Sequence, residues 1–377
     1  MIGRRSKMKL IFTNEERINE IKASLGERER YELRERAEAM MKLPYLSVTQ
    51  DKSPAASGDI HDYYSEGPYW WPDPKNPDGP YVRRDGEFNP ERFNAHNEKL
   101  MKLSSAVYTL AAAGLYLDEP AYTKRAVEHI RVWFLNAETK MNPNLNHAQA
   151  IRGITTGRGI GIIDTTVLLQ VVNGANLIEY GGDYGDDIAA LKAWFAEYVH
   201  WLRTSENGIY ERDYFNNHSN WYNTQLAGFL AFIGEDPTPC FEHFIKVILP
   251  KQTGEDGSFT DELTRTNSYM YSGFNLEASA LICHIAESYG FDLWGAVAEN
   301  GRSMRRSIEF FKPYYKNPFE WKHRQIHSDE STFAESISMK LAARAFADAE
   351  LDAINKNKRK NRIPMRTQCR AGITDLF

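Results

Sequence analysis

The sequence predicts an all-α fold, a toroid of antiparallel helix pairs that forms a single domain. Long stretches carry apolar residues at helical spacing, and the breaks between them are rich in Gly, Asn, Pro and Asp. The alternation of apolar and polar residues that marks strands is scarce, and no strand–helix–strand rhythm is present. No repeat of fixed period indicates an open solenoid. A ring of helix pairs accounts for many helices and for functional loops gathered at one end.

The chain divides into three predicted parts. Residues 1–46 form an N-terminal helical segment, with Gly26 as a candidate break. Residues 47–350 form the toroid domain, and within it residues 47–90 form an ordered loop over the cleft, rich in Pro, Gly and aromatic residues. Residues 351–377 form a C-terminal tail with a basic, polar stretch.

Each predicted helix rests on its periodicity and its boundaries. In residues 91–116, Leu100, Leu103 and Val107 share one face, and Pro120 suits the start of the next helix. The later stretches end at loop-forming residues in the same way. The predicted helices cover residues 14–42, 91–116, 121–134, 165–180, 188–202, 221–233, 240–249, 274–289, 302–314 and 330–349.

Composition excludes several classes of protein. The 377 residues are 42% hydrophobic and 26% charged, with a formal net charge of −5, which does not suit a disordered chain, collagen or a nucleic-acid binder. No apolar run approaches the ~20 residues of a membrane helix, and Leu10–Phe12 is too short for a signal-peptide core. We expect a soluble chain, cytoplasmic as written, or periplasmic or secreted if a leader has been removed. Cys240, Cys283 and Cys369 lie far apart, which indicates reduced thiols and no disulfide framework.

Aromatic residues make up 12% of the chain and gather in polar loops as well as in apolar stretches. Tyr64, Trp70 and Trp71 precede Arg83 in the loop over the cleft. Rings can stack on the apolar face of a sugar, and a guanidinium can pair with its carboxylate. We expect these residues to bind an acidic sugar chain; the alternative is a loop that only caps the helices.

Residues 142–164 form a Gly-rich segment with amide side chains and an arginine. Such side chains can bind the hydroxyl and carboxylate groups of a ligand. The run from Gly157 to Gly161 resembles a phosphate-binding loop, but no strand precedes it and its spacing is wrong for a dinucleotide. We therefore reject a nucleotide site. The candidate binding residues of this segment are Asn146, His147, Gln149 and Arg158.

The run Asn-Asn-His-Ser-Asn-Trp places Asn217 and His218 just before a predicted helix, which we expect to begin near Ser219 or Asn220. Donors at such a junction can converge on an anion, and Trp221 is a further candidate for substrate binding. Helix capping alone, a buried structural histidine and an N-glycosylation sequon are the alternatives.

Arg265, Tyr269 and Tyr271 lie in a polar context of Asn and Ser residues. If the segment is helical, the two tyrosines cannot point into the same cleft, because they differ by two positions. The alternative is that both fill space in the core. We expect no metal site, because His323 and His327 lack the glutamate and the third ligand of a zinc protease.

Four segments, residues 62–86, 142–164, 216–221 and 262–276, resemble the alginate-lyase-type polysaccharide lyases, families five and thirty-eight. The resemblance spans about residues 60–340, and its specificity lies in the Asn-Asn-His-Ser-x-Trp run together with the later Arg…Tyr pair. The Tyr-Trp-Trp-Pro-Asp-Pro loop is similar to family thirty-eight and has no clear match in family five. The resemblance implies a helical toroid that cleaves uronate polymers by β-elimination, with no required metal and no cofactor.

The resemblance also implies roles for individual residues. Asn217, His218 and Arg265 match family residues that donate to the uronate carboxylate and stabilise the developing enolate. Tyr271 is expected to take the C5 proton and to return a proton to the O4 leaving group. Tyr269 is the alternative base.

Stereochemistry narrows the substrate. Mannuronate and glucuronate share their configuration at C4 and C5, where the hydrogen and the leaving oxygen lie syn, so one tyrosine can serve as base and acid. We expect mannuronate-rich alginate as substrate, with β-1,4-glucuronan as the alternative. Guluronate requires anti elimination, for which His218 could be the base. Two other classes stay open. One is a uronide hydrolase, which needs two carboxylates, with Asp73, Asp164, Asp261 and Glu262 as candidates. The other is a non-catalytic uronan-binding protein. The sequence predicts neither endo or exo action nor the oligomeric state.

Overall fold

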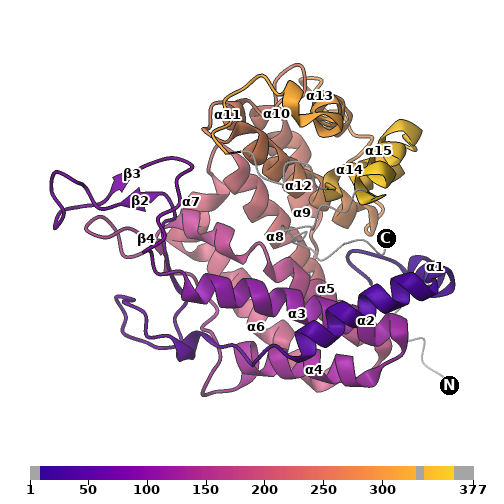
Figure 1. The fold of residues 1–377 in the computed structure, drawn as a ribbon, viewed down its shortest axis with the longest axis horizontal. Helices are drawn as coiled ribbons and strands as arrows, with labels where there is room; N and C mark the ends of the chain where they lie inside the picture. Colours follow the sequence, from indigo (N-terminus) through magenta and orange to yellow (C-terminus); the bar gives the residue numbers. More distant parts are fainter. Residues whose placement is uncertain (1–8, 328–334, 361–377) are drawn as a thin grey trace.

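The computed structural model describes residues 9–327 and 335–360, and it confirms the all-α prediction (Figure 1). Residues of the predicted last helix before 335, and Cys369, lie outside the described residues. The helices are α1 (Glu15–Ser24), α2 (Glu27–Met41), α3 (Ala95–Leu117), α4 (Pro120–Ile130), α5 (Leu168–Gly181), α6 (Gly185–Thr204), α7 (Glu206–Arg212), α8 (Asn217–Ile233), α9 (Thr238–His243), α10 (Leu249–Gln252), α11 (Thr260–Leu263), α12 (Ser268–Glu287), α13 (Met304–Lys316), α14 (Ile337–Ala345) and α15 (Ala349–Lys360).

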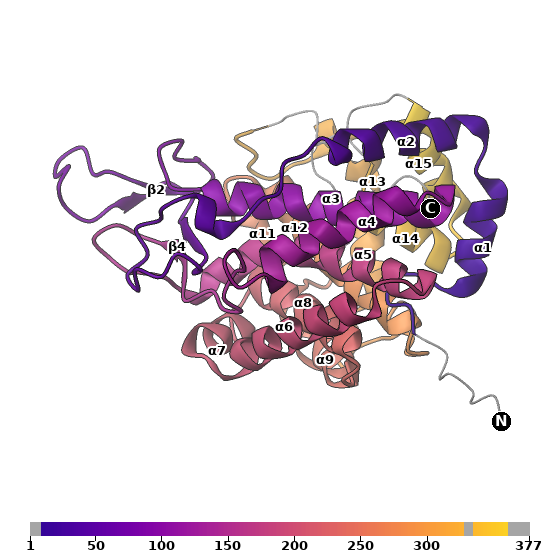
Figure 2. The same ribbon diagram turned by 90° about the horizontal axis from the view of Figure 1, so that it is seen from below.

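Four short strands are confined to the loops. β1 (Tyr64–Glu66) pairs in parallel with β4 (His147–Ala150), and β2 (Trp70–Trp71) pairs antiparallel with β3 (Val82–Arg83). Both views place β2 and β4 at the end of the molecule opposite α1 and α14 (Figures 1 and 2). The loops that the sequence singled out therefore gather at one end of the helices.

The core is formed by helices that pack as neighbours around α5 and α8. α3 packs against α4 and α5, and α8 packs against α5, α6 and α12. The facing sides bury Leu, Val, Ala and aromatic residues, including Leu103 and Val107 of α3 as expected from their spacing. α3 is long and apolar enough to cross a membrane by length and composition, contrary to expectation, but 78% of that window is buried within the molecule.

Several boundaries differ from those expected. α7, α11 and α15 were not expected, and α15 takes up the beginning of the predicted C-terminal tail. α12 begins at Ser268, six residues before the predicted start, because its first turn consists of polar and aromatic residues that hide the apolar periodicity. α1 and α2 are separate helices, which confirms the break near Gly26.

The apolar residues near the N-terminus close the end of the toroid away from the strands. Leu10, Ile11 and Phe12 are all buried in the core. The Ile11 backbone N–H donates to the Asn176 side chain of α5 at 2.9 Å, and His284 Nε2 of α12 donates to the Phe12 carbonyl at 2.8 Å. This segment thus ties two helices together, which the sequence alone did not reveal.

We expect Phe12→Ala to lower the free energy of unfolding by about 3–5 kcal/mol, because it removes a buried ring from a packed core. Phe319→Ala is the matched control: its ring is 85% exposed, so its change should stay within about 0.5 kcal/mol. Urea denaturation followed by circular dichroism measures both. Equal effects of the two substitutions would contradict the role of the N-terminal segment.

Candidate functional site

The N-terminus of α8 presents two of the predicted residues. α8 begins at Asn217, two or three positions before the expected start, because Asn216 caps it and accepts from the His218 backbone N–H. The Asn217 backbone N–H and side-chain Nδ2 both donate to Glu262 Oε1, at 2.8 and 2.7 Å. The predicted junction of loop and helix is therefore one turn earlier, and Asn217 is held by a carboxylate.

Glu262 connects Asn217 with Arg265. Its side chain is fully buried, and its second oxygen, Oε2, lies 3.9 Å from Arg265 Nη1. Burial raises the pKa of Glu262, whereas the hydrogen bonds from Asn217 and the charge of Arg265 oppose that rise. A buried carboxylate thus holds an amide and a guanidinium in fixed positions.

Arg265 lies over the face of the Tyr271 ring, with 3.6 Å between the guanidinium carbon and the ring centroid. The Tyr271 hydroxyl donates to the hydroxyl of Tyr69, which comes from the loop over the cleft. Burial and the neighbouring Tyr69 raise the pKa of Tyr271, and the Arg265 charge acts in the opposite direction. Tyr271 is therefore a buried phenol between a cation and a second phenol.

Asp85, also in that loop, accepts hydrogen bonds from two nitrogens of Arg265. Arg265 Nη2 and Nε lie 2.8 and 3.3 Å from its carboxylate oxygens, and the Thr266 side chain donates to it at 3.0 Å. Arg83 donates to Asp85 as well, at 2.8 Å. Although burial alone would raise it, Arg265 and Thr266 lower the pKa of Asp85 to about 2. The loop is thus attached to the candidate site through an ionised carboxylate.

His218 faces a second buried glutamate. Its Nδ1 lies 2.6 Å from Oε1 of Glu211, which is fully buried in α7. The Tyr214 ring meets the His218 ring edge-on, with 5.4 Å between the centroids. Burial raises the pKa of Glu211, and the charge and hydrogen bond of His218 oppose that rise. His218 is therefore held by a buried carboxylate of α7 and by an aromatic ring.

Arg158 and Gln149 form a neighbouring group. Arg158 donates to the backbone and side-chain oxygens of Gln149, both at 3.0 Å, and Gln149 Nε2 donates to Asp164 at 3.0 Å. Gln149 adopts a left-handed backbone with φ 48°, an unfavourable conformation for a residue with a β-carbon. Burial and the nearby Arg83 lower the pKa of Arg158, whose guanidinium lies 5.9 Å from the Trp70 ring. This group and the Tyr271 group are thus both adjacent to Arg83.

Glycines in this segment allow close backbone packing. A β-carbon on Gly157 would collide with the carbonyl of Asn146, and one on Gly161 would collide with Ala148. These close contacts require glycine at both positions, so the Gly-rich run needs no phosphate site to account for it.

Other predicted residues lie further out. Trp71 donates its indole N–H to the Glu87 carbonyl at 3.1 Å. Asn146 is exposed and accepts from the indole of Trp201 at 2.9 Å, and His147 lies 3.5 Å from the Asp62 carboxylate. These contacts hold the loop over the cleft and β4 in place.

Three of the predicted substrate contacts are buried in the structure. Trp221 is fully buried and packs on Phe274. Tyr269 is buried against Phe311, on a different side of α12 from Tyr271, as the two-residue offset requires. Tyr64 is buried as well, and its hydroxyl donates to Glu66.

Sequence reasoning missed three residues of this site, Tyr69, Asp85 and Glu211, and it gave Glu262 only as a candidate carboxylate of a hydrolase. Tyr69 and Asp85 lie within residues 62–86, which the sequence analysis assigned to substrate binding. The composition of that segment therefore indicated the region but not these two residues. Nothing in the sequence distinguishes Glu211 from the many exposed glutamates.

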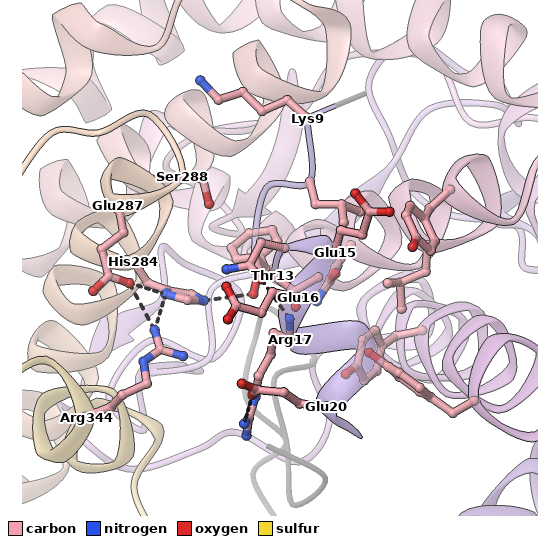
Figure 3. A pocket seen from close by; sticks show the side chains of 18 residues that line it. Lys9, Thr13, Glu15, Glu16, Arg17, Glu20, His284, Glu287, Ser288 and Arg344 are labelled. Carbon is pink, nitrogen blue, oxygen red and sulfur yellow. Dashed lines mark hydrogen bonds and ion pairs between the residues drawn. The ribbon is translucent and has the colours of Figure 1, made fainter. Parts of the chain in front are cut away.

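The described residues hold no group of three or more His, Cys, Asp or Glu that could bind a metal ion. They do include a separate pocket of ≈1310 Å³, lined by α1 and by His284, Glu287 and Arg344 (Figure 3). His284 stands 13 positions after Tyr271 on the same helix, about 20 Å along its axis. This pocket therefore lies away from the Tyr271 group.

The comparisons with known proteins agree on one family. The alginate lyase family model matches residues 47–321. A crystal structure of an alginate lyase from Bacteroides ovatus is 32% identical, with a TM-score of 0.87 and 97% of each chain covered. Alginate lyase A1-III from Sphingomonas species A1 is 17% identical, with a TM-score of 0.51, 85% of this chain and 88% of that chain covered. A variant of alginate lyase A1-III complexed with a tetrasaccharide is 16% identical, with a TM-score of 0.53 and the same coverage. The A1-III structures support the fold alone. No curated protein sequence matches.

Proposed function

Since the chain belongs to the alginate lyase family, we propose that it cleaves a 1,4-linked uronate polymer by β-elimination, with mannuronate-rich alginate as its preferred substrate. The observation that carries the proposal is the Tyr271 phenol beneath the Arg265 guanidinium, close to the helix terminus that presents Asn217 and His218. A phenol that can exchange a proton and donors that can meet a carboxylate are the two requirements of this reaction.

In the proposed reaction Tyr271 removes the C5 proton of the uronate at the cleavage point. The electron pair of the broken C–H bond forms the C4=C5 double bond, and the C4–O4 bond breaks. Tyr271 then returns the proton to the departing O4, so that proton and electrons balance. Because one tyrosine makes both proton transfers in this proposal, they occur on one face of the sugar, as the syn arrangement of mannuronate and glucuronate requires.

The contacts of Arg265 modify the role that the resemblance implied. Two of its donor nitrogens are engaged by Asp85, and its guanidinium faces the Tyr271 ring. Arg265 then acts chiefly by stabilising the Tyr271 phenolate and by fixing the loop, whereas Asn217 and His218 meet the uronate carboxylate.

The buried carboxylates support elimination over hydrolysis. A hydrolase needs two carboxyl groups that face the scissile bond. Glu262 and Glu211 are instead fully buried and engaged by Asn217 and His218, and Asp164 accepts from Ser65, Tyr63 and Gln149. Each of these three carboxylates therefore has a holding role.

Ultraviolet absorbance tests the proposal, because the C4=C5 bond conjugated to the carboxylate absorbs. Polymannuronate, polyguluronate and β-1,4-glucuronan are mixed separately with the protein, and new reducing ends are measured in parallel. Absorbance that rises fastest with polymannuronate supports the proposal. A faster rise with glucuronan would reassign the substrate, and new reducing ends without absorbance would indicate a hydrolase.

The raised pKa of Tyr271 predicts the pH dependence of turnover. Burial keeps this pKa above its usual value near 10, so the phenolate is a minor form at neutral pH. Its fraction rises about tenfold per pH unit below the pKa, and kcat/KM should follow on its acidic limb with a slope of about one. Initial rates on polymannuronate between pH of about 5 and 9 measure the slope. A flat profile across that range would contradict a tyrosine base.

A further inference from the structure

Glu211 stands out among the buried charged groups because its only direct side-chain partner among the hydrogen bonds of the described residues is His218. The carboxylate is fully buried, and its Oε1 lies 2.6 Å from His218 Nδ1. Its second oxygen, Oε2, is buried and accepts no hydrogen bond from the described residues. A carboxylate placed this way interacts with one edge of the imidazole ring.

The fold fixes both partners of this contact. Glu211 lies in the last turn of α7, and His218 lies in the first turn of α8, only a short turn later. Asn216 holds the backbone of His218 by accepting its N–H at 3.2 Å. The remaining freedom of His218 is the orientation of its ring and the position of its protons, and Glu211 controls both.

Several charged or titratable groups surround this pair. Besides His218, the positive charge of Arg158 lowers the pKa of Glu211, and the negative charge of Asp164 raises it. Glu262 interacts with His218 from the side of Asn217. The neighbouring phenols are Tyr198 and Tyr214.

We propose that Glu211 is a positioning residue that holds His218 with the hydrogen on Nδ1 and leaves Nε2 as the nitrogen that meets the substrate. The inference rests on the proposed function and deepens it. A carboxylate only accepts hydrogen bonds, so its contact with Nδ1 selects the tautomer. When Nε2 is also protonated, the buried negative charge stabilises the imidazolium, which can then donate from Nε2 to the uronate carboxylate.

The tautomer is tested first, on the free protein. Nitrogen NMR of protein labelled at histidine distinguishes a ring nitrogen that carries hydrogen from one that does not, and His218→Gln assigns the signals. We expect wild-type His218 to carry its hydrogen on Nδ1. In Glu211→Gln this preference should weaken, because the amide can donate as well as accept, and in Glu211→Asp it should persist. A wild-type His218 with hydrogen on Nε2 alone would overturn the inference.

Kinetics test the consequence. We expect Glu211→Gln to lower kcat about 100-fold, as for the loss of one stabilising donor, and to change KM less than about threefold. Glu211→Asp should recover part of kcat, since it retains the charge. Asp213→Asn is the matched control, because Asp213 is exposed and pairs with Arg212. Wild-type kcat in a folded Glu211→Gln variant, or a loss of kcat with an unchanged tautomer, would overturn the inference.

The two proposals fail separately. If the wild-type protein acts on none of the three polymers, the proposed function fails, while the NMR measurement still decides whether Glu211 selects the tautomer. If wild-type turnover is present and Glu211 has no effect on the tautomer, only the inference about Glu211 fails.

Discussion

Tyr271→Phe is expected to lower kcat at least about 1000-fold on the polymer that the wild type cleaves fastest. The substitution removes one hydroxyl and retains the ring beneath Arg265, so packing and binding should be preserved. Positioned acid–base groups contribute about 10²–10⁴-fold to a rate, and here one hydroxyl serves in both proton transfers. Ultraviolet initial rates give kcat, and binding of the polymer by the inactive variant confirms an intact site.

Two matched variants identify the base. Tyr69→Phe removes the hydroxyl that accepts from Tyr271, and we expect a loss of about tenfold or less. Tyr269→Phe removes a hydroxyl in the core, away from Tyr271, and should leave kcat unchanged. If Tyr69→Phe abolishes turnover and Tyr271→Phe does not, the two phenols exchange roles. If neither matters, the base is a different group.

The helices could be predicted from the sequence where their buried faces are apolar. Leu103 and Val107 of α3 show this: helical spacing and burial agree. The apolar spacing did not predict where α8 and α12 begin, because their first turns carry Asn, His, Ser and Tyr. Those turns form the candidate site, and their polar residues interrupt the apolar pattern on which the helix prediction depends.

The site could be predicted only as separate segments. The resemblance pointed to Asn217, His218, Arg265 and Tyr271, and the structure brings Asn217 and Arg265 together through Glu262. What local sequence cannot reveal is contact between distant segments. Asp85 and Arg265 are 180 positions apart, and Tyr69 and Tyr271 are 202 apart. The burial of Trp221 likewise depends on its contact with Phe274 of α12. Its polar neighbours in the sequence therefore did not indicate that the side chain is buried.

Arg265→Lys is expected to lower kcat about 100-fold. Lysine retains a positive charge, but it cannot donate from two nitrogens to Asp85 while it lies flat on the Tyr271 ring. Because the guanidinium lowers the pKa of Tyr271, its loss should also move the acidic limb of the kcat/KM profile to higher pH. Arg212→Lys is the matched control, since Arg212 pairs with Asp213 on the surface.

A double-mutant cycle separates the two roles of Arg265. Asp85→Asn weakens the attachment of the loop but leaves the cation on the Tyr271 ring. If Arg265 acts through the loop, the effects of Asp85→Asn and Arg265→Lys on kcat/KM should be coupled by about 0.5–3 kcal/mol. If it acts through the phenolate, Arg265→Lys should shift the pH profile to higher pH, whereas Asp85→Asn, which removes a charge that raises the Tyr271 pKa, should shift it to lower pH. We expect both results, because one guanidinium makes both contacts. If the effects are additive and the pH profile is unshifted, Arg265 neither fixes the loop nor stabilises the phenolate. Its expected role would then be to donate to the uronate carboxylate.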